Sequence, residues 1–185
     1  GMVLSNLACM THGSTMVLPG PVFNAEDVLR TVHAERCTAL HGVPTMFIAE
    51  LSHPHFERYD YETLRTGIMA GSPCPIEVMK EVATKMHMSE IVIVYGQTEC
   101  SPGITMTTTR DPLERRVSTV GKAFPHTEVK IIDPKSGKIL PRGEVGEICA
   151  RGYCVMKCYY NNPSATHATI DGNRWNHTGD LGTMD

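Results

Sequence analysis

An aromatic ring, a hydroxyl group and a carboxylate lie close together in the run Tyr95-Gly96-Gln97-Thr98-Glu99. The ring of Tyr95 offers a flat face on which a base or another planar ligand can stack. Thr98 offers a hydroxyl group, and Glu99 offers the hard oxygens that hold Mg²⁺ between a protein and phosphates. Gly96 lets the backbone turn or lets a ligand approach closely. These residue types fit a nucleotide site, although an ordinary strand end with a surface threonine and glutamate would look the same.

The residues just before this run are expected to form a buried strand that positions it. Residues 91–94 read Ile-Val-Ile-Val, a β-branched run typical of a strand covered on both faces. Residues 75–86 carry apolar side chains at helical spacing, and residues 67–70 form a small-residue strand ahead of them. Strand, helix and strand in this order predict a parallel or mostly parallel α/β sheet, with ligands at the carboxyl ends of its strands.

Two further helices and a strand are expected earlier in the chain. Asn24 is a plausible N-terminal cap for a helix that runs to about Glu35. Residues 38–40 form a short strand that ends at Gly42, and Pro44 suits the first turn of another helix. The first part of the chain, residues 1–110, is therefore predicted to be an α/β subdomain.

After about Arg110 the pattern changes to short strands separated by turn residues. Residues 127–132, 138–140 and 146–150 are strand-like, and the segments between them contain proline and glycine. This spacing predicts a small antiparallel sheet or a distorted barrel over residues 111–185. The connection near residues 108–118 contains Arg115 and Arg116 and is expected to lie on the surface.

The overall composition restricts the class of protein. With 41% apolar residues, 20% charged residues and a formal net charge of −3, the chain reads as a soluble globular piece of 185 residues. Its lysines and arginines form no cluster, so a nucleic-acid partner is not expected. No apolar stretch is long enough to span a bilayer and no secretory leader opens the chain, which predicts no transmembrane segment and a cytoplasmic location.

Cysteine and histidine raise the question of a metal site. Seven cysteines without a leader indicate free thiols in a reducing compartment. Cys149, Cys154 and Cys158, followed by His167, invite a zinc interpretation, but no close Cys-x-x-Cys spacing is present, so buried or half-buried thiols are expected instead. His53 and His55 flank a proline and are expected to form a polar turn rather than a pair of ligands.

Beyond the chemistry of single residues, the run YGQTE resembles the signature strand end of the adenylate-forming superfamily. That superfamily includes acyl-CoA synthetases, firefly-type luciferases and the adenylation domains of peptide synthetases. Other family motifs follow in the same order over nearly the whole chain, which makes the resemblance specific. The segments that carry it are 67–73, 95–99, 120–122, 128–133, 143–152, 159–163 and 175–180.

The resemblance implies a role for each matching residue in nucleotide binding. Tyr95 would stack on adenine, and Gly71, Ser72 and Pro73 would lie on the opposite face of the base. Thr98 would contact the α-phosphate of ATP, and Glu99 would bind Mg²⁺; these are the two residues expected to be catalytic. Gly96 and Gln97 belong to the same nucleotide-binding signature. Asp180 would accept hydrogen bonds from the ribose hydroxyls, a task that suits an acceptor-only carboxylate.

The resemblance also implies which acid is activated. Ala70, Gly71, Gly96 and Gly121 would line the acyl-binding region. Acetate-activating relatives place a tryptophan at the position of Gly96, so glycine here favours medium-chain or longer fatty acids, or aryl acids. Ala70 stands where many relatives have glycine, and His126 also replaces a common glycine.

The reaction implied is that of an AMP-forming acyl-CoA synthetase, with ATP, Mg²⁺ and coenzyme A as cofactors and co-substrates. Its phosphate-binding loop is expected before Gly1, and its hinge and lysine-bearing C-terminal domain after Asp185. These missing N- and C-terminal parts of the same enzyme are its expected partners, and the chain alone is expected to be inactive. An amino-acid adenylation domain of a peptide synthetase and a non-catalytic nucleotide-binding fragment are the alternatives.

Overall fold

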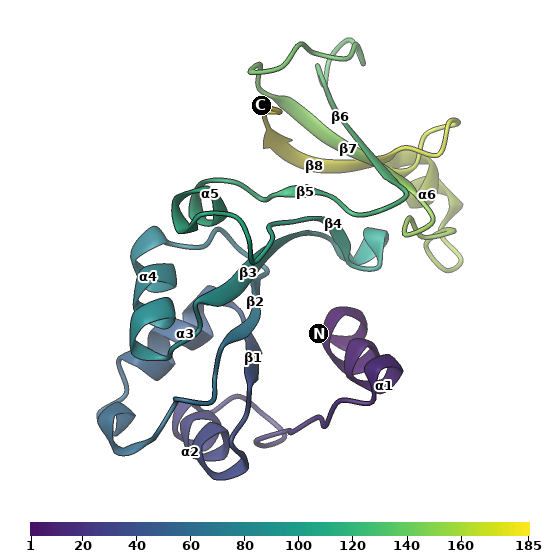
Figure 1. Ribbon diagram of the computed structural model, residues 1–185. Helices are drawn as coiled ribbons and strands as arrows, with labels where there is room; N and C mark the ends of the chain where they lie inside the picture. Colours follow the sequence, from purple (N-terminus) through teal and green to yellow (C-terminus); the bar gives the residue numbers. More distant parts are fainter. The chain divides into compact units, whose positions relative to one another are not determined.

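The computed structural model describes residues 1–185 and divides into two compact units (Figure 1). Unit 1 contains Gly1–Tyr95 and Met106–Lys122, and unit 2 contains Gly96–Thr105 and Ala123–Asp185. The predicted α/β class is confirmed, because a parallel strand arrangement occurs in unit 1 and a second, small sheet occurs in unit 2.

Unit 1 is built on three parallel strands, β1 (Ala39–Gly42), β2 (Thr66–Ala70) and β3 (Glu90–Gly96). All four residues from Ile91 to Val94 are buried, as the β-branched run predicted. In register, Ala70 pairs with Val94, so β2 and β3 end side by side. The residues that follow these two strands therefore leave the sheet at one edge.

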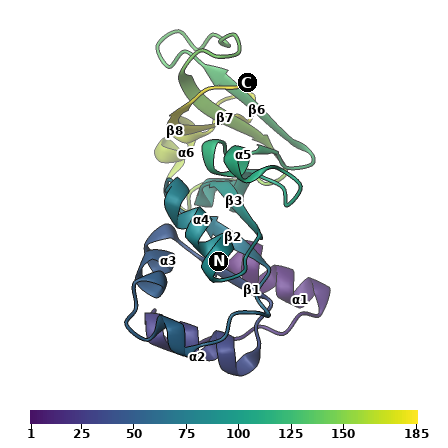
Figure 2. The same ribbon diagram turned by 60° about the vertical axis from the view of Figure 1, so that its left-hand side comes forward.

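Three helices pack along one side of these strands, α2 (Ala25–Glu35), α3 (Pro44–Leu51) and α4 (Ile76–Lys85) (Figures 1 and 2). The side chain of Asn24 accepts a hydrogen bond of 3.1 Å from the backbone N–H of Asp27, which confirms the predicted cap of α2. The core between helices and strands is apolar and methionine-rich; its fully enclosed members include Leu29, Phe47, Met69, Met79, Val82, Met86, Met88 and Ile91.

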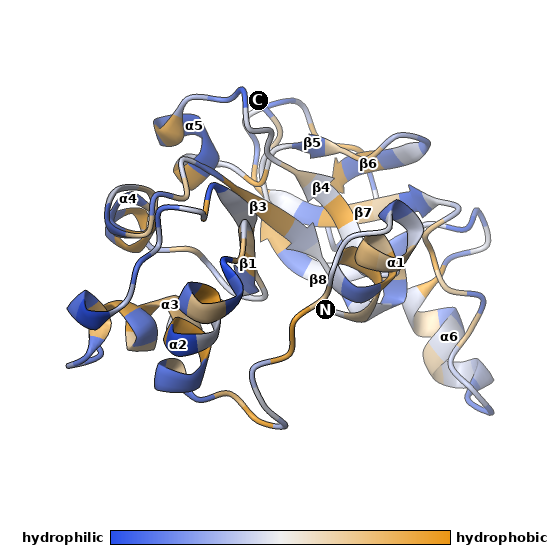
Figure 3. Cartoon of the chain, turned by 60° about the horizontal axis from the view of Figure 1, so that its bottom comes forward, coloured by the Kyte–Doolittle hydropathy of each residue, from blue (hydrophilic) through white to orange (hydrophobic).

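The N-terminal residues form a helix that the sequence patterns did not predict, η1 (Met2–Leu7) continuing into α1 (Ala8–His12). It is tied to β1 by a 2.6 Å hydrogen bond between Ser5 Oγ and His41 Nδ1. Met2 and Met10 are 70% and 69% exposed, so much of its apolar surface is uncovered. The segment that joins α1 to α2 also shows hydrophobic residues at its surface (Figure 3).

The segment near residues 108–118 was expected to be a surface connection, and this expectation is wrong for Arg116. Residues Leu113–Ser118 form helix α5, and Arg116 is buried rather than exposed, at 7% of its surface. Its Nη1 group donates hydrogen bonds to the carbonyl oxygens of Ser89, at 2.8 Å, and Ile91, at 2.6 Å. These two carbonyl acceptors offset part of the cost of burying the guanidinium group, whose Nε atom is buried without a hydrogen-bond partner.

Unit 2 contains the antiparallel sheet β6 (Thr127–Ile132), β7 (Gly146–Gly152) and β8 (Asn176–Gly182), with helix α6 (Pro163–Thr169) between the last two strands. No closed barrel forms, because the sheet has only these three strands. The predicted strand at residues 138–140 is reduced to a single bridge between Ile132 and Ile139.

The shorter elements complete the chain. They are two 3₁₀ turns, η2 (Phe56–Arg58) and η3 (Thr98–Cys100), and two short strands, β4 (Gly103–Met106) and β5 (Lys122–Ala123). The backbone N–H of Phe124 donates to the carbonyl of Ile104 at 3.0 Å, just beyond β5. None of the helices has the length and apolar character needed to cross a lipid bilayer.

Candidate active site

The edge at which β2 and β3 end carries the predicted adenine-binding residues of unit 1. Gly71 follows the paired residue Ala70, and Tyr95 follows its partner Val94. Tyr95 is half-buried, whereas Gly71, Ser72 and Pro73 are exposed. The structure thus brings a tyrosine and an exposed glycine-containing turn to the same edge, as an aromatic stacking site requires.

Gly71 has a φ of +95°, a backbone conformation that side chains rarely adopt. A Cβ atom at this position would also lie 3.1 Å from Cγ1 of Val43, tighter than ordinary van der Waals contact. Glycine is therefore required by the local backbone, and its bare Cα leaves space beside the exposed turn.

The other two predicted acyl-lining glycines are also required by close backbone contacts. Gly121 has a φ of +78°, and an added Cβ would overlap the carbonyl of Met106 within unit 1. In unit 2, an added Cβ at Gly96 would overlap the carbonyl of Pro102. The absence of a side chain at Gly96 thus has a packing cause as well as the substrate-related cause implied by the resemblance.

The chain passes from unit 1 into unit 2 between Tyr95 and Gly96, and the η3 turn then presents Thr98 and Glu99. Gln97 has an extended backbone, and Thr98 is exposed. Glu99 is half-buried, and its backbone carbonyl accepts a 2.8 Å hydrogen bond from the N–H of Met156. This bond ties the η3 turn to the segment that follows β7.

The carboxylate of Glu99 is held by a second residue of that segment, Tyr159. The phenolic hydroxyl of Tyr159 donates to Oε1 of Glu99 at 2.6 Å. This hydrogen bond raises the pKa of Tyr159, because the phenol is the donor to a charged acceptor. Sequence reasoning assigned Tyr159 to a family motif without giving it a role. Its position at the start of the 159–163 motif gave no indication that it faces Glu99.

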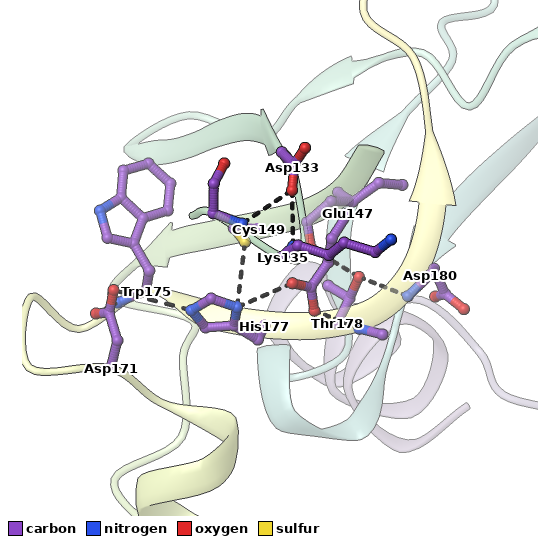
Figure 4. A network of polar contacts seen from close by, with 12 residues as sticks. Asp133, Lys135, Glu147, Cys149, Asp171, Trp175, His177, Thr178 and Asp180 are labelled. Carbon is purple, nitrogen blue, oxygen red and sulfur yellow. Dashed lines mark hydrogen bonds and ion pairs between the residues drawn. The ribbon is translucent and has the colours of Figure 1, made fainter. Parts of the chain in front are cut away.

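The predicted ribose-binding residue, Asp180, is exposed on β8. A network of hydrogen bonds holds the backbone around it (Figure 4). Its backbone N–H donates to Oγ1 of Thr178 at 3.1 Å, and Thr178 in turn donates to the carbonyl of Ile148 at 2.7 Å. Gly179, with a φ of +75°, donates its N–H to Oε1 of Glu147 at 3.1 Å. Two side chains thus fix the backbone on which Asp180 is carried.

Trp175 lies just before β8, and two cations approach its ring. The Nζ atom of Lys130 is 4.2 Å from the centre of the indole ring, and Cζ of Arg151 is 4.6 Å from it. Cation–π attraction of this kind stabilises the ring and the strand register around it. Arg151 is also paired with Glu128 through two hydrogen bonds of 2.9 and 2.8 Å.

The cysteine and histidine predictions have mixed outcomes. Cys149 and Cys154 are buried as expected, but Cys158 is exposed, and all seven cysteines are free. Burial raises the pKa of Cys149 to about 11. His53 and His55 lie in a turn as expected, and both approach the carboxylate of Glu26, at 3.6 and 2.8 Å.

Comparison with known proteins gives the family. Residues 1–160 match the family described as AMP-binding enzyme, so the chain belongs to the AMP-binding enzyme family. That match contains the strand ends of unit 1 and the 95–99 segment, and it confirms the family inferred from the motifs.

Two curated relatives are similar to this chain over its whole length. YngI of Bacillus subtilis, assigned by name to the acyl-CoA synthetases, is 56% identical over 185 residues, which are 100% of this chain and 34% of YngI. The mitochondrial medium-chain acyl-CoA ligase ACSF2 of Rattus norvegicus is 40% identical over 100% of this chain and 30% of its own length. The chain therefore spans about a third of the length of these curated relatives.

A solved structure agrees with the fold. ATP-bound MatB from Rhodopseudomonas palustris matches 99% of this chain and 35% of its own chain, with a TM-score of 0.82 and 32% sequence identity. The mixed α/β arrangement with a second small sheet is thus that of the N-terminal part of adenylate-forming enzymes.

Proposed function

We propose that this chain is the nucleotide-binding part of an AMP-forming acyl-CoA synthetase, which activates a carboxylic acid with ATP and transfers the acyl group to coenzyme A. The observation that carries the proposal is the arrangement of Thr98 and Glu99 on the η3 turn, with the carboxylate of Glu99 held by Tyr159 at 2.6 Å. The names of the relatives support the same reaction.

In the proposed reaction a carboxylate oxygen of the acid attacks the α-phosphorus of ATP, and pyrophosphate leaves. The thiol of coenzyme A then attacks the acyl carbon, and AMP leaves with the oxygen that came from the acid. Both steps depend on positioning and on stabilising negative charge on phosphate oxygens.

The residues of this chain would position the nucleotide. Tyr95, beside the exposed turn at Gly71 and Ser72, would stack on adenine. Thr98 would donate its hydroxyl to the α-phosphate, and Asp180 would accept from the ribose hydroxyls, because its carboxylate can take two donors. Gln97 and Pro73 complete the nucleotide contacts in this proposal.

Glu99 fits a magnesium ligand by the chemistry of its carboxylate. It is half-buried, and one of its oxygens is already oriented by the Tyr159 hydroxyl. Bound Mg²⁺ would offset phosphate charge, and hard carboxylate oxygens are the ligands that it prefers. Tyr159 would keep the carboxylate in the rotamer that presents its second oxygen.

The substrate proposed is a medium-chain or longer fatty acid, or an aryl acid. Gly96 and Ala70 leave no bulky side chain at the positions that the family uses for the acyl group, with Gly71 and Gly121 nearby in the motifs. The name of ACSF2, a medium-chain acyl-CoA ligase, supports the same class.

A panel assay on the full-length protein tests this function. The protein is incubated with ATP, Mg²⁺, coenzyme A and single acids of two to sixteen carbons, benzoate or amino acids, and acyl-CoA and AMP are quantified by chromatography. We expect thioester and AMP in equal amounts with fatty or aryl acids, and little with acetate. Turnover with amino acids alone would instead favour the adenylation domain of a peptide synthetase.

The 185-residue chain by itself is proposed to be inactive, because it spans about a third of the relatives. Calorimetric titration of the isolated chain with ATP and Mg²⁺ tests this point. We expect weak or undetectable binding, and turnover by the isolated chain would contradict the proposal. Binding without any turnover in the full-length protein would favour a non-catalytic nucleotide-binding protein.

A further inference from the structure

Three potential metal ligands from two neighbouring strands converge in unit 2 (Figure 4). Glu147 and Cys149 are two residues apart on β7, where the pairing with β8 shifts register, and both side chains reach the ring of His177. His177 on β8 is the register partner of Cys149 and lies directly opposite it. One carboxylate oxygen, one thiol sulfur and one imidazole nitrogen all lie within 4.8 Å of one another.

The separations between these atoms suit a single ion. Nδ1 of His177 lies 3.0 Å from Oε2 of Glu147 and 3.7 Å from Sγ of Cys149. In tetrahedral zinc sites, metal–ligand bonds of about 2.0–2.3 Å place neighbouring ligand atoms about 3.3–3.6 Å apart. The two separations from His177 thus differ from these values by only a few tenths of an ångström, and the Glu147 oxygen and the Cys149 sulfur lie within 4.8 Å of each other.

A second carboxylate lies near the imidazole of His177, on the side away from Glu147. The second nitrogen of the ring, Nε2, faces Oδ2 of Asp171 at 3.9 Å. Asp171 is fixed by its other oxygen, which accepts hydrogen bonds of 2.9 Å from the N–H groups of Asn173 and Trp175. The carboxylate of Glu147 can only accept, so without metal the imidazole proton lies on Nδ1. When an ion binds Nδ1, this proton moves to Nε2, where the carboxylate of Asp171 would accept it, as in sites with a carboxylate behind the ligating histidine.

We propose that Glu147, Cys149 and His177 form a zinc-binding site in unit 2, with Asp171 as the outer carboxylate that orients His177. A mixed nitrogen, oxygen and sulfur set selects zinc over magnesium or calcium, which prefer oxygen alone. A thiolate and a carboxylate together neutralise the charge of the ion. On binding, the Cys149 thiol gives its proton to solvent, and water fills the fourth position.

Access and surrounding charge are compatible with an ion at this place. The side chains of His177 and Glu147 are 30% and 14% exposed, so the cluster opens to solvent on the histidine side. Lys130 is opposite Cys149 on β6, but its ammonium group lies over the Trp175 ring, 4.2 Å from its centre. The charge of Lys130 is thus held by an aromatic partner.

A second cluster, Glu26 with His53 and His55 in unit 1, is a weaker candidate and serves as a comparison. The backbone N–H of His55 donates to Nδ1 of His53 at 3.2 Å. A neutral imidazole has one lone-pair nitrogen, so this bond leaves the proton on Nε2, the atom that faces Glu26. To free that nitrogen for a metal, the hydrogen bond from His55 to Nδ1 would have to break, whereas freeing Nδ1 of His177 breaks only the contact with Glu147 that the ion replaces.

Cobalt substitution in the full-length protein tests the proposal without ATP or an acid substrate. The reduced, chelator-treated protein is titrated with Co²⁺ alone, and the thiolate-to-cobalt charge-transfer absorption is followed before Zn²⁺ is added. We expect the band to saturate at one equivalent and to vanish when Zn²⁺ displaces Co²⁺. No band in the wild-type protein would overturn the site, whether or not the protein makes acyl-CoA.

Variants assign the band to this cluster. Cys149→Ser is expected to abolish it, whereas Cys158→Ser, which removes an exposed thiol of the same unit, leaves it unchanged. Since Cys149 is buried, His177→Gln and Asp171→Asn at half-buried positions provide variants that keep the core. Asp171→Asn should weaken zinc binding by about 10- to 100-fold. A band that persists in folded Cys149→Ser, or disappears in His53→Gln, would refute the assignment.

Discussion

The hydroxyl of Tyr159 donates a 2.6 Å hydrogen bond to Oε1 of Glu99, joining the loop after β7 to the turn that follows the signature strand. Sixty residues separate the two in sequence. A hydrogen bond to a charged acceptor is stronger than a neutral one, so this contact fixes one rotamer of Glu99. Residues of two family motifs thus meet at one proposed metal ligand.

Replacing Tyr159 with phenylalanine should weaken the use of Mg²⁺. The variant removes only the hydroxyl, and loss of a hydrogen bond to a charged group costs about 1.5–3 kcal/mol. We expect kcat/KM for MgATP in the full-length protein to fall by about tenfold or more, with an increased Mg²⁺ requirement. Tyr160→Phe is the matched control, because Tyr160 is 92% exposed. Equal losses in both variants would show that the Glu99 contact has no special role.

Replacing Asp180 should weaken nucleotide binding without unfolding the protein. The residue is exposed on β8, and Asp180→Asn keeps its size and its backbone hydrogen bond to Thr178. Losing one acceptor for a ribose hydroxyl should raise KM for ATP by about tenfold, while the circular dichroism spectrum stays the same. Glu144→Gln, an exposed change in the same unit, is the control. Unchanged ATP kinetics in Asp180→Asn would exclude the ribose role.

A methyl group at Gly96 should destabilise the fold. A Cβ there would overlap the carbonyl of Pro102, so the backbone of unit 2 must move. We expect Gly96→Ala to lower the free energy of unfolding by about 1–3 kcal/mol in urea denaturation. Gly172→Ala is the matched control, because a Cβ at Gly172 meets no atom within 4 Å. If the two variants are equally stable, the close approach at Gly96 is not maintained in solution.

The buried carboxyl group of Glu50 should make stability depend on pH. Glu50 is 2% exposed and its Oε2 has no hydrogen-bond partner, and burial raises its pKa from 4.5 to about 8. The folded state then binds this proton more tightly than the unfolded state. The free energy of unfolding therefore decreases as pH rises between these values, by at most about 1.4 kcal/mol per pH unit.

Denaturation of Glu50→Gln over the same range isolates this contribution. The amide stays neutral, so the variant should lose less stability than the wild-type protein between pH values of about 5 and about 8. Glu62→Gln, an exposed substitution in the same unit, should retain the wild-type slope. The same slope in Glu50→Gln as in wild type would show that Glu50 is not the group responsible.

Much of unit 1 could be predicted because local signals and burial agree there. Asn24 caps α2, Pro44 begins α3, and the β-branched residues 91–94 form a strand buried on both faces. The sequence reasoning failed at Arg116, because nothing local to a pair of arginines shows that one of them reaches the carbonyls of Ser89 and Ile91. Long-range hydrogen bonds of this kind leave no periodic signal.

The sequence was enough to identify the residues of the candidate site, but it did not predict which side chains contact one another there. Family motifs picked out Thr98, Glu99 and Asp180, but they gave no sign that the carboxylate of Glu99 is held by Tyr159, sixty residues away. Cysteine spacing grouped Cys149 with Cys154 and Cys158, whereas strand register places it opposite His177. His126 was recognised as replacing a common glycine, and its φ of +59° gives the physical reason for glycine at that position.

Oxygen transfer tests the central claim most directly. The full-length protein is incubated with a medium-chain acid labelled with ¹⁸O in its carboxylate, together with ATP, Mg²⁺ and coenzyme A, and the products are analysed by mass spectrometry. Acyl-adenylate formation predicts one labelled oxygen in AMP, because the attacking carboxylate oxygen leaves with AMP when the thiol displaces it. Unlabelled AMP, or label in inorganic phosphate with ADP as the nucleotide product, would contradict the account.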